Sequence, residues 1–203
     1  MAELRRVDPL AIPVYYDFAS SLCYVAHRVL ERMRRELDAL GISLVWTPID
    51  LVRITGWRRG DPIAGARRDN ALRVSRELGV ALRMPERWMD SRRALAVALS
   101  LRGGPREASW RERVWPAVYQ EGRSLDDANW LDVLGEELGI DLATAASARA
   151  LDALATETAL AAEVEVSGVP TFLLDRWPIG GIQEERTMLS LLGRYAARRR
   201  RVH

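Results

Sequence analysis

Hydrophobic positions follow two different repeats near the start of the chain, and their order predicts a strand, a helix and a second strand. An apolar, β-branched and aromatic run at 12–18 is typical of a buried strand. From about Ser20 to Leu40 the apolar residues recur every three or four positions, which predicts an amphipathic helix that Gly41 ends. Residues Ile42 to Trp46 predict the second strand. This βαβ order favours parallel pairing with a right-handed crossover.

Strand patterns disappear in the long middle of the chain, where helical periodicity takes over. Asp61-Pro62 and Pro85 are interpreted as helix starts, because proline is favoured at the first helical position. Ser124 is predicted to cap the start of a helix with acidic residues in its first turn. Asp141 is predicted to cap a further helix that continues to about Val164. The middle of the chain is therefore expected to be all-helical.

The end of the chain returns to strands. Residues 169–175 and 176–181 predict an antiparallel hairpin, and an amphipathic helix is expected from about Glu184 to Ala197. The order βαβ, helices, ββα predicts an α/β fold with a large all-helical insertion. We assign 1–52 together with 165–203 to the α/β domain, and 53–164 to the helical insertion domain.

Composition excludes several classes of site. The only cysteine of the 203 residues is Cys23, so an intramolecular disulfide and a cysteine-based zinc cluster are excluded, and we expect no metal. The net charge of +2 gives no reason to expect nucleic acid as a partner. No apolar run approaches the roughly 18 residues that a membrane span requires. We see no signal peptide and therefore expect a cytoplasmic protein with no membrane partner.

Ser20 and Cys23 stand where the first strand meets the helix. Unpaired N–H groups and the helix dipole stabilise an anion at such a place, and a thiolate is one such anion. Ser20 is either a thiolate stabiliser or an N-cap serine without a chemical role. Cys23 is either a redox or ligand-binding thiol or a small core residue. The alternatives for Asp17 are electrostatic tuning of the site and capping of the junction, and for His27 a reactive pair with Cys23 and an ordinary histidine.

Two further groups are candidates for ligand binding. Trp57 and Arg58 lie near other arginines where the helical block begins, and they are candidates for binding the carboxylates of a ligand. The alternative for them is a solvated arginine-rich face. Gln183 and Glu184 follow the predicted hairpin and are candidates for contacting a ligand amine.

Three stretches resemble the DsbA family of the thioredoxin superfamily. They are Asp17 to Tyr24 at the family's active-site position, Trp46 to Leu51 with the family's W-x-P-x-x-L pattern, and Gly168 to Phe172 followed by Gly180-Gly181-Ile182-Gln183. The resemblance implies a thioredoxin-like fold. It also implies a cis bond between Val169 and Pro170, which leaves the Val169 backbone open to pair with an extended, thiol-bearing ligand.

Within that family, the residues from Ser20 to Cys23 separate two branches. Disulfide oxidoreductases carry Cys-x-x-Cys, and a serine cannot replace the attacking thiolate. The other branch comprises 2-hydroxychromene-2-carboxylate isomerase and the kappa-class glutathione transferases, and Asp17, Ser20 and Tyr24 match its pattern. That resemblance implies glutathione as cofactor, with Ser20 hydrogen-bonded to its sulfur. The chain departs from the branch at Ser21, where proline is usual, and at 180–186, which resembles cytoplasmic DsbA-like proteins.

Three functions follow from these resemblances. The first is a glutathione-dependent isomerase or transferase that acts on a small electrophilic substrate. The second is a DsbA-like thiol-disulfide oxidoreductase that uses Cys23 with an external thiol. The third is a family member that binds a ligand or partner without catalysis. The resemblance also implies a homodimer, as in many relatives.

Overall fold

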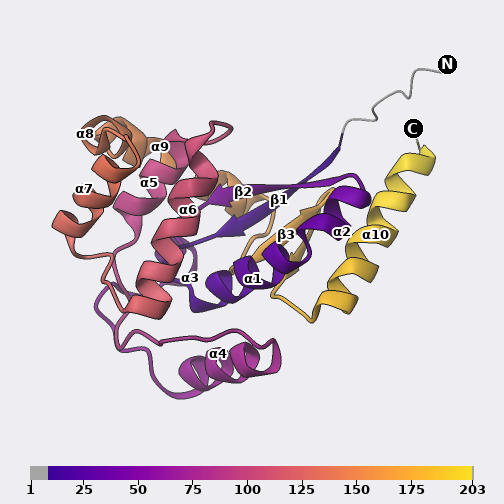
Figure 1. The fold of residues 1–203 in the computed structure, drawn as a ribbon, viewed down its shortest axis with the longest axis horizontal. Helices are drawn as coiled ribbons and strands as arrows, with labels where there is room; N and C mark the ends of the chain where they lie inside the picture. The colour runs from indigo at the N-terminus through magenta and orange to yellow at the C-terminus, as the bar shows by residue number, and fades with distance from the viewer. Residues whose placement is uncertain (1–8, 203) are drawn as a thin grey trace.

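A four-stranded mixed sheet forms the centre of the computed structural model, which describes residues 9–202 (Figure 1). Its strands are β1 (Leu10–Tyr16), β2 (Ile42–Pro48), β3 (Thr171–Leu174) and β4 (Trp177–Gly180), in the order β2-β1-β3-β4. β1 is parallel to β2 and antiparallel to β3, and β3 and β4 form an antiparallel hairpin. The expected βαβ unit and terminal hairpin are both confirmed.

The crossover between β1 and β2 contains two helices, α1 (Ser21–Arg32) and α2 (Arg34–Ala39). The single helix expected from Ser20 to Leu40 is therefore wrong in its continuity, because Met33 leaves the helical conformation with φ −89° and ψ 3°. Met33 and Leu37 both remain buried across the break. Hydrophobic periodicity does not detect the break for that reason.

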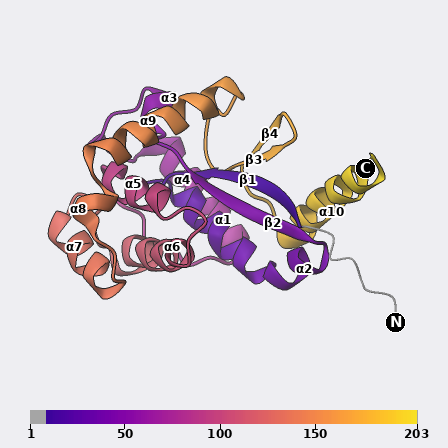
Figure 2. The same ribbon diagram turned by 90° about the horizontal axis from the view of Figure 1, so that it is seen from above.

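Eight helical segments lie between β2 and β3. They are α3 (Val52–Thr55), α4 (Gly65–Glu77), α5 (Arg92–Ser100), α6 (Arg106–Pro116), the π-helical turn Ala117–Glu121, α7 (Ala128–Glu137), α8 (Leu142–Ala145) and α9 (Ala148–Glu163). Figure 2 shows α6 on the same side of β2 as α1 and α2, and α3 and α9 on the opposite side. Within residues 9–202, no helix is long and apolar enough to cross a membrane.

The two proline-based helix starts are wrong. Pro62 forms an isolated antiparallel bridge with Arg87, and the N–H of Ile63 donates to the carbonyl of Glu86 at 2.8 Å. The segments that contain Pro62 and Pro85 therefore pair with each other, and α4 and α5 begin only after them. A pairing between two segments so far apart in the chain leaves no local signal in either of them.

The caps of the middle helices agree with the sequence only in part. The helix expected at Ser124 begins later, where the Asp127 carboxylate accepts a bond of 3.1 Å from the N–H of Trp130. Asp141 is a cap as expected, with a 3.1 Å bond from the N–H of Ala143, but it caps the short α8. The continuous helix expected to follow Asp141 is therefore two helices.

The last helix, α10 (Glu185–Val202), is longer than expected. Arg198 and Arg199 form ion pairs of 3.2 and 3.3 Å with Asp175 in the β3–β4 turn. These contacts tie the arginine-rich end to the hairpin, although each is partly exposed and contributes modestly.

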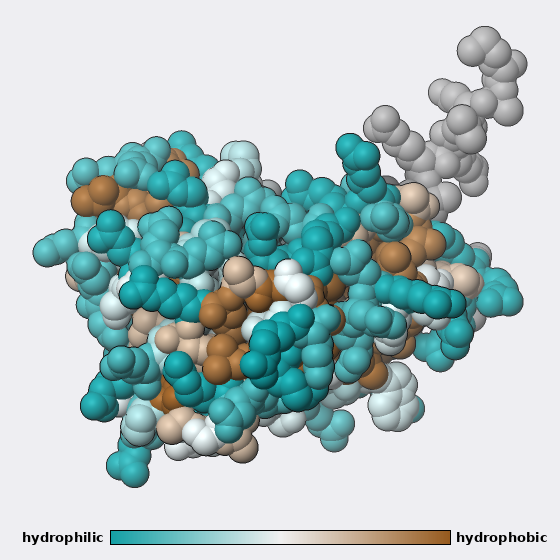
Figure 3. All heavy atoms as spheres, turned by 60° about the horizontal axis from the view of Figure 1, so that its bottom comes forward, coloured by the Kyte–Doolittle hydropathy of each residue, from teal (hydrophilic) through white to brown (hydrophobic). Residues whose placement is uncertain are grey.

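Aromatic side chains attach α6 to the sheet. The Trp115 ring on α6 lies 5.2 Å from the rings of Tyr16 and Phe18 and 5.4 Å from Trp46, measured between centroids. Such pairs contribute about 0.5–1.5 kcal/mol beyond the area that they bury. Figure 3 shows one face of the molecule, on which a hydrophobic patch in the middle is surrounded by hydrophilic residues.

Candidate functional site

Ser20 is the N-cap residue of α1. Its backbone is extended, with φ −87° and ψ 111°, and its carbonyl accepts hydrogen bonds from the N–H groups of Cys23 (3.0 Å) and Tyr24 (3.3 Å). The Ser20 side chain makes no capping hydrogen bond. The backbone of Ser20 therefore begins the helix, while its hydroxyl is not committed to the helix end.

The first turn of α1 keeps free backbone donors. The N–H groups of Ser21 and Leu22 find no backbone acceptor within residues 9–202. The turn also contains no acidic residue that would offset the helix dipole. Free N–H groups and an uncompensated positive helix end together favour a bound anion.

Asp17 fixes the loop that precedes Ser20. Its carboxylate is fully buried and accepts hydrogen bonds from the N–H groups of Ala19 (2.8 Å) and Leu51 (3.0 Å). Burial raises the pKa of Asp17 to about 6, against the lowering effect of hydrogen bonds from Ser91, Ala19 and Leu51. The carboxyl thus joins the β1–α1 loop to the end of β2, and it changes charge in the mildly acidic range.

Cys23 lies one turn inside α1 and is fully buried. Burial raises the pKa of its thiol to about 12, although the Ser20 hydroxyl and the Asp17 backbone lower it. At neutral pH the sulfur is therefore a protonated thiol without solvent access, which is a poor nucleophile.

Two tyrosines and a glutamine support the same junction, and sequence reasoning missed two of the three. Tyr24 on α1 stacks on Tyr119, with ring centroids 5.2 Å apart. The Tyr119 hydroxyl donates to the carbonyl of Phe18 at 3.0 Å, and the Gln120 amide donates to the Tyr24 hydroxyl at 2.7 Å. The π-helical turn that carries Tyr119 and Gln120 thereby holds the loop before Ser20. Only tertiary structure brings it there.

The segment before β3 approaches the same end of the sheet. The bond between Val169 and Pro170 is cis. Thr171 pairs with Tyr15 near the end of β1, so the antiparallel register places Pro170 beside the start of the loop to Ser20. The backbone N–H and carbonyl of Val169 make no hydrogen bond within residues 9–202. They are therefore open to a partner strand.

The remaining candidates lie on loops. Gln183 and Glu184 are exposed between β4 and α10. Trp57 meets Trp88 edge to face at 4.8 Å and lies under the Arg67 guanidinium at 3.5 Å. The N–H of Arg58 donates to Asp61 at 3.3 Å. No hydrogen bond in the described part of the chain joins these four candidates to Ser20, so their role remains a prediction.

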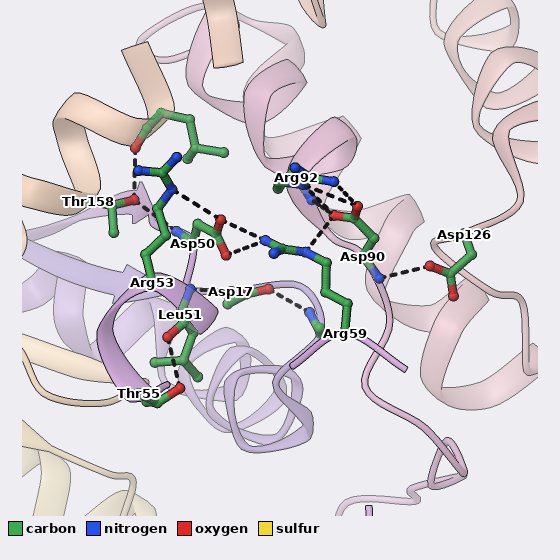
Figure 4. Close-up of polar contacts among 12 residues, drawn as sticks. Asp17, Asp50, Leu51, Arg53, Thr55, Arg59, Asp90, Arg92, Asp126 and Thr158 are labelled. Carbon is green, nitrogen blue, oxygen red and sulfur yellow. Dashed lines mark hydrogen bonds and ion pairs between the residues drawn. The ribbon is translucent and has the colours of Figure 1, made fainter. Parts of the chain in front are cut away.

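A partly buried ion-pair network lies beside Asp17 (Figure 4). It contains Arg59, one of the arginines expected from the sequence to bind the carboxylates of a ligand, which pairs instead with carboxylates of the chain itself. The Arg59 guanidinium donates to both oxygens of Asp50 at 2.7 and 2.6 Å and to Asp90 at 3.0 Å. The N–H of Asp50 donates to the Thr158 hydroxyl at 2.9 Å. Since Leu51 is bonded to Asp17, this network fixes the loop after β2 against the site. The available signal was an acidic residue, Asp50, inside the largely apolar W-x-P-x-x-L stretch.

Comparisons with known proteins agree on the fold. Residues 11–193 match the model of the DSBA-like thioredoxin domain. The search of curated proteins gives no match.

Three solved structures illustrate the likeness. One is 2-hydroxychromene-2-carboxylate isomerase, with a TM-score of 0.74 and 23% identity, covering 96% of this chain and 100% of that one. The cytosolic disulfide reductase DsbM from Pseudomonas aeruginosa with GSH gives 0.62 and 22%, covering 93% and 96%. The alpha-DsbA1 of Wolbachia pipientis gives 0.60 and 12%, covering 94% and 86%. At these sequence identities, the similarity shows only that the fold is shared.

Proposed function

The chain belongs to the DSBA-like thioredoxin domain family, and on that premise we propose that it is a glutathione-dependent isomerase or transferase in which Ser20 stabilises a bound thiolate. One observation carries the proposal. The Ser20 hydroxyl makes no capping hydrogen bond and interacts with the Cys23 thiol, at a helix end that has free N–H groups and no acidic residue in its first turn. A hydroxyl donor and a positive helix end are both favourable to a thiolate.

The chain offers a partner for each part of glutathione. The Ser20 hydroxyl and the first-turn N–H groups would hold the sulfur, and the Val169 backbone, unpaired within residues 9–202, would form strand-like hydrogen bonds to the cysteinyl peptide. Gln183 and Glu184 contact the γ-glutamyl end, and Arg58, beside Trp57, contacts a carboxylate. A DsbM structure with GSH supports glutathione as a ligand in a protein of similar fold.

The division of chemical work follows from this arrangement. When bound, glutathione would supply a thiolate nucleophile for an electrophilic carbon of a small unsaturated substrate. Ser20 donates a hydrogen bond that favours the charged sulfur, and the helix end adds a fixed positive potential. Asp17 holds the loop that carries Ser20, through the N–H groups of Ala19 and Leu51. It is a positioning residue.

The structure argues against Cys23 as the attacking group of an oxidoreductase. Its thiol is fully buried and its pKa is raised to about 12 by burial. Disulfide exchange needs an accessible thiolate, so Cys23 fits the core better than the reaction. Because glutathione is kept reduced in the cytoplasm, the proposal also places the protein there.

Glutathione titration by calorimetry tests the proposal, with two neighbouring serines as a matched pair. Ser20→Ala should weaken binding about tenfold near neutral pH, because a hydrogen bond to a charged group is lost. Ser21→Ala should change it less than about twofold, since only its side chain is removed and its N–H remains. Absence of binding to the wild type, or equal affinity in Ser20→Ala, would contradict the proposal.

A further inference from the structure

A cavity of about 370 Å³ opens between α1, α2, β2 and α6. Figures 1 and 2 show these elements next to one another, with α6 beside the α1–α2 pair on one side of β2. Neither Ser20 nor Cys23 is among the residues that line it. The cavity is therefore distinct from the helix end at Ser20. Its volume lies in the range of small-molecule sites.

Arg111 is the charged residue buried in this cavity, with its side chain 9% exposed. Its Nη1 donates to Glu107 at 3.2 Å, whereas its Nε is buried and has no hydrogen-bond partner within residues 9–202. The guanidinium carbon lies 5.0 Å from the centroid of the Trp46 ring, in the range of a cation–π contact. A buried donor without an acceptor is costly and calls for an explanation. Nη2 also makes no hydrogen bond within residues 9–202, so the guanidinium has donor capacity left for an anion.

His27 lies next to Arg111 in the cavity wall and is also buried. Its ring packs against Trp115 and Trp46, with centroid distances of 4.7 and 5.8 Å, and it makes no hydrogen bond within residues 9–202. Burial, followed by the charge of Arg111, lowers the pKa of His27 to about 3. The imidazole is therefore neutral at pH 7 and presents one donor and one acceptor.

Acidic residues of the cavity lie at its rim. Glu31 pairs with Arg28 at 2.7 Å, and Glu112 faces Arg34 at 3.8 Å. Both carboxylates are more than a third exposed, and Asp38 is exposed too. Solvated rim charges are screened, whereas the charge of a buried group is screened much less. Among the residues that line the cavity, Arg111 is therefore the least screened charge, although the Glu107 carboxylate at 3.2 Å offsets part of it.

The other walls are apolar. Besides the Trp46 ring, they are formed by Leu30, Leu37, Ile42 and Leu44. Apolar walls with few polar groups that fix orientation are typical of a site for a small organic molecule. Trp46 adds only a small part of its surface to these walls, because it is 7% exposed and its ring contacts Tyr16, His27, Trp115 and Arg111.

We propose that this cavity binds a small aromatic carboxylate. The carboxylate accepts hydrogen bonds from Arg111, the ring packs against the apolar walls that include Leu30 and Leu44, and His27 makes one neutral hydrogen bond. Binding here requires neither Ser20 nor glutathione, so it stands independently of the proposed function. The two sites share α1: Ser20 stands at the N-terminal end of this helix, and His27, further along it, lines the cavity.

Titration with sodium benzoate, followed by NMR of the tryptophan indole N–H groups, tests this site. The Trp46 signal, identified by its loss in Trp46→Phe, should shift saturably with benzoate. Uncharged benzamide, which has nearly the same shape, should bind at least about tenfold more weakly, because it lacks the charge that Arg111 recognises. No saturable shift, which means a cavity filled by solvent, or equal binding of the two probes would overturn the proposal.

Variants locate the site within the cavity. Arg111→Gln should weaken benzoate binding about tenfold or more, while Glu112→Gln at the rim should change it less than about twofold. Arg111→Gln should leave glutathione affinity unchanged. If Arg111→Gln does not fold, the comparison of benzoate with benzamide on the wild-type protein decides alone. Equal loss of benzoate affinity in both variants would contradict the assignment to Arg111.

Discussion

The N-terminal end of α1 and the residues that follow it along the helix have opposite environments for charge. At its start, the Ser20 hydroxyl caps no N–H group, and the N–H groups of Ser21 and Leu22 find no backbone acceptor within residues 9–202. One and two turns later, Cys23 and His27 are packed in the core, and burial moves the pKa of each toward its neutral form. The helix therefore stabilises negative charge at its tip and excludes charge from its body. A sulfur that reacts at this site must come from outside the chain.

The largest expected effect concerns Cys23. Because burial raises the pKa of its thiol to about 12, its thiolate fraction at pH 8 should be roughly a thousandfold below that of the unfolded chain. Alkylation by iodoacetamide, followed by mass spectrometry, should be slower in the native protein by at least that factor. Rapid alkylation without denaturant would show a reactive thiolate at Cys23 and would contradict the claim that the body of α1 excludes charge.

Asp17 should give the next largest effect, through pH. Its folded pKa of about 6 lies above the ordinary 3.8, so the folded state binds the proton more tightly. The contribution of this group to stability is present below pH 4 and is lost as the pH rises from about 4 to 6. From its shift, the free energy of unfolding of the wild type should fall by about 2 kcal/mol relative to Asp17→Asn over that interval.

Asp90 provides a control of opposite sign for that measurement. Burial raises its pKa, but hydrogen bonds from Arg92 and the charges of Arg59 and Arg92 lower it overall. Its contribution is therefore lost as the pH falls below about 4, and Asp90→Asn should change the pH profile only there. Denaturant titrations at several pH values measure both variants. A pH-independent difference between wild type and Asp17→Asn would contradict the account of Asp17.

A smaller effect is expected when the single cysteine is moved from position 23 to position 20. In the double variant Ser20→Cys/Cys23→Ala, the new thiol stands at the helix tip without a second cysteine. Its pKa should be about 7.5 or lower, as for other helix-tip cysteines, while Cys23 of the wild type stays protonated. Alkylation rates between pH 5 and 10 measure both. If the pKa of the introduced thiol is at or above the value in an unfolded peptide, the helix tip does not favour a thiolate.

The strand–helix junction and the terminal hairpin were predictable because their signals are local. An apolar run followed by Ser20 and a helical repeat is enough to locate the first, and two short strands around Asp175 the second. The pairing of Pro62 with Arg87 and the ion pairs of Arg59 were not predictable. They depend on contacts between segments that only the completed fold brings together.

The central claim is that Ser20 stabilises a thiolate that the chain does not itself supply. The most direct test is the pKa of the thiol of bound glutathione, followed by thiolate absorbance at saturating ligand in wild type, Ser20→Ala and Ser21→Ala. We predict that binding to the wild type lowers this pKa by about two units, and that Ser20→Ala, but not Ser21→Ala, reverses about one of them. A bound thiol that titrates like free glutathione, or identically in the wild type and Ser20→Ala, would contradict the account.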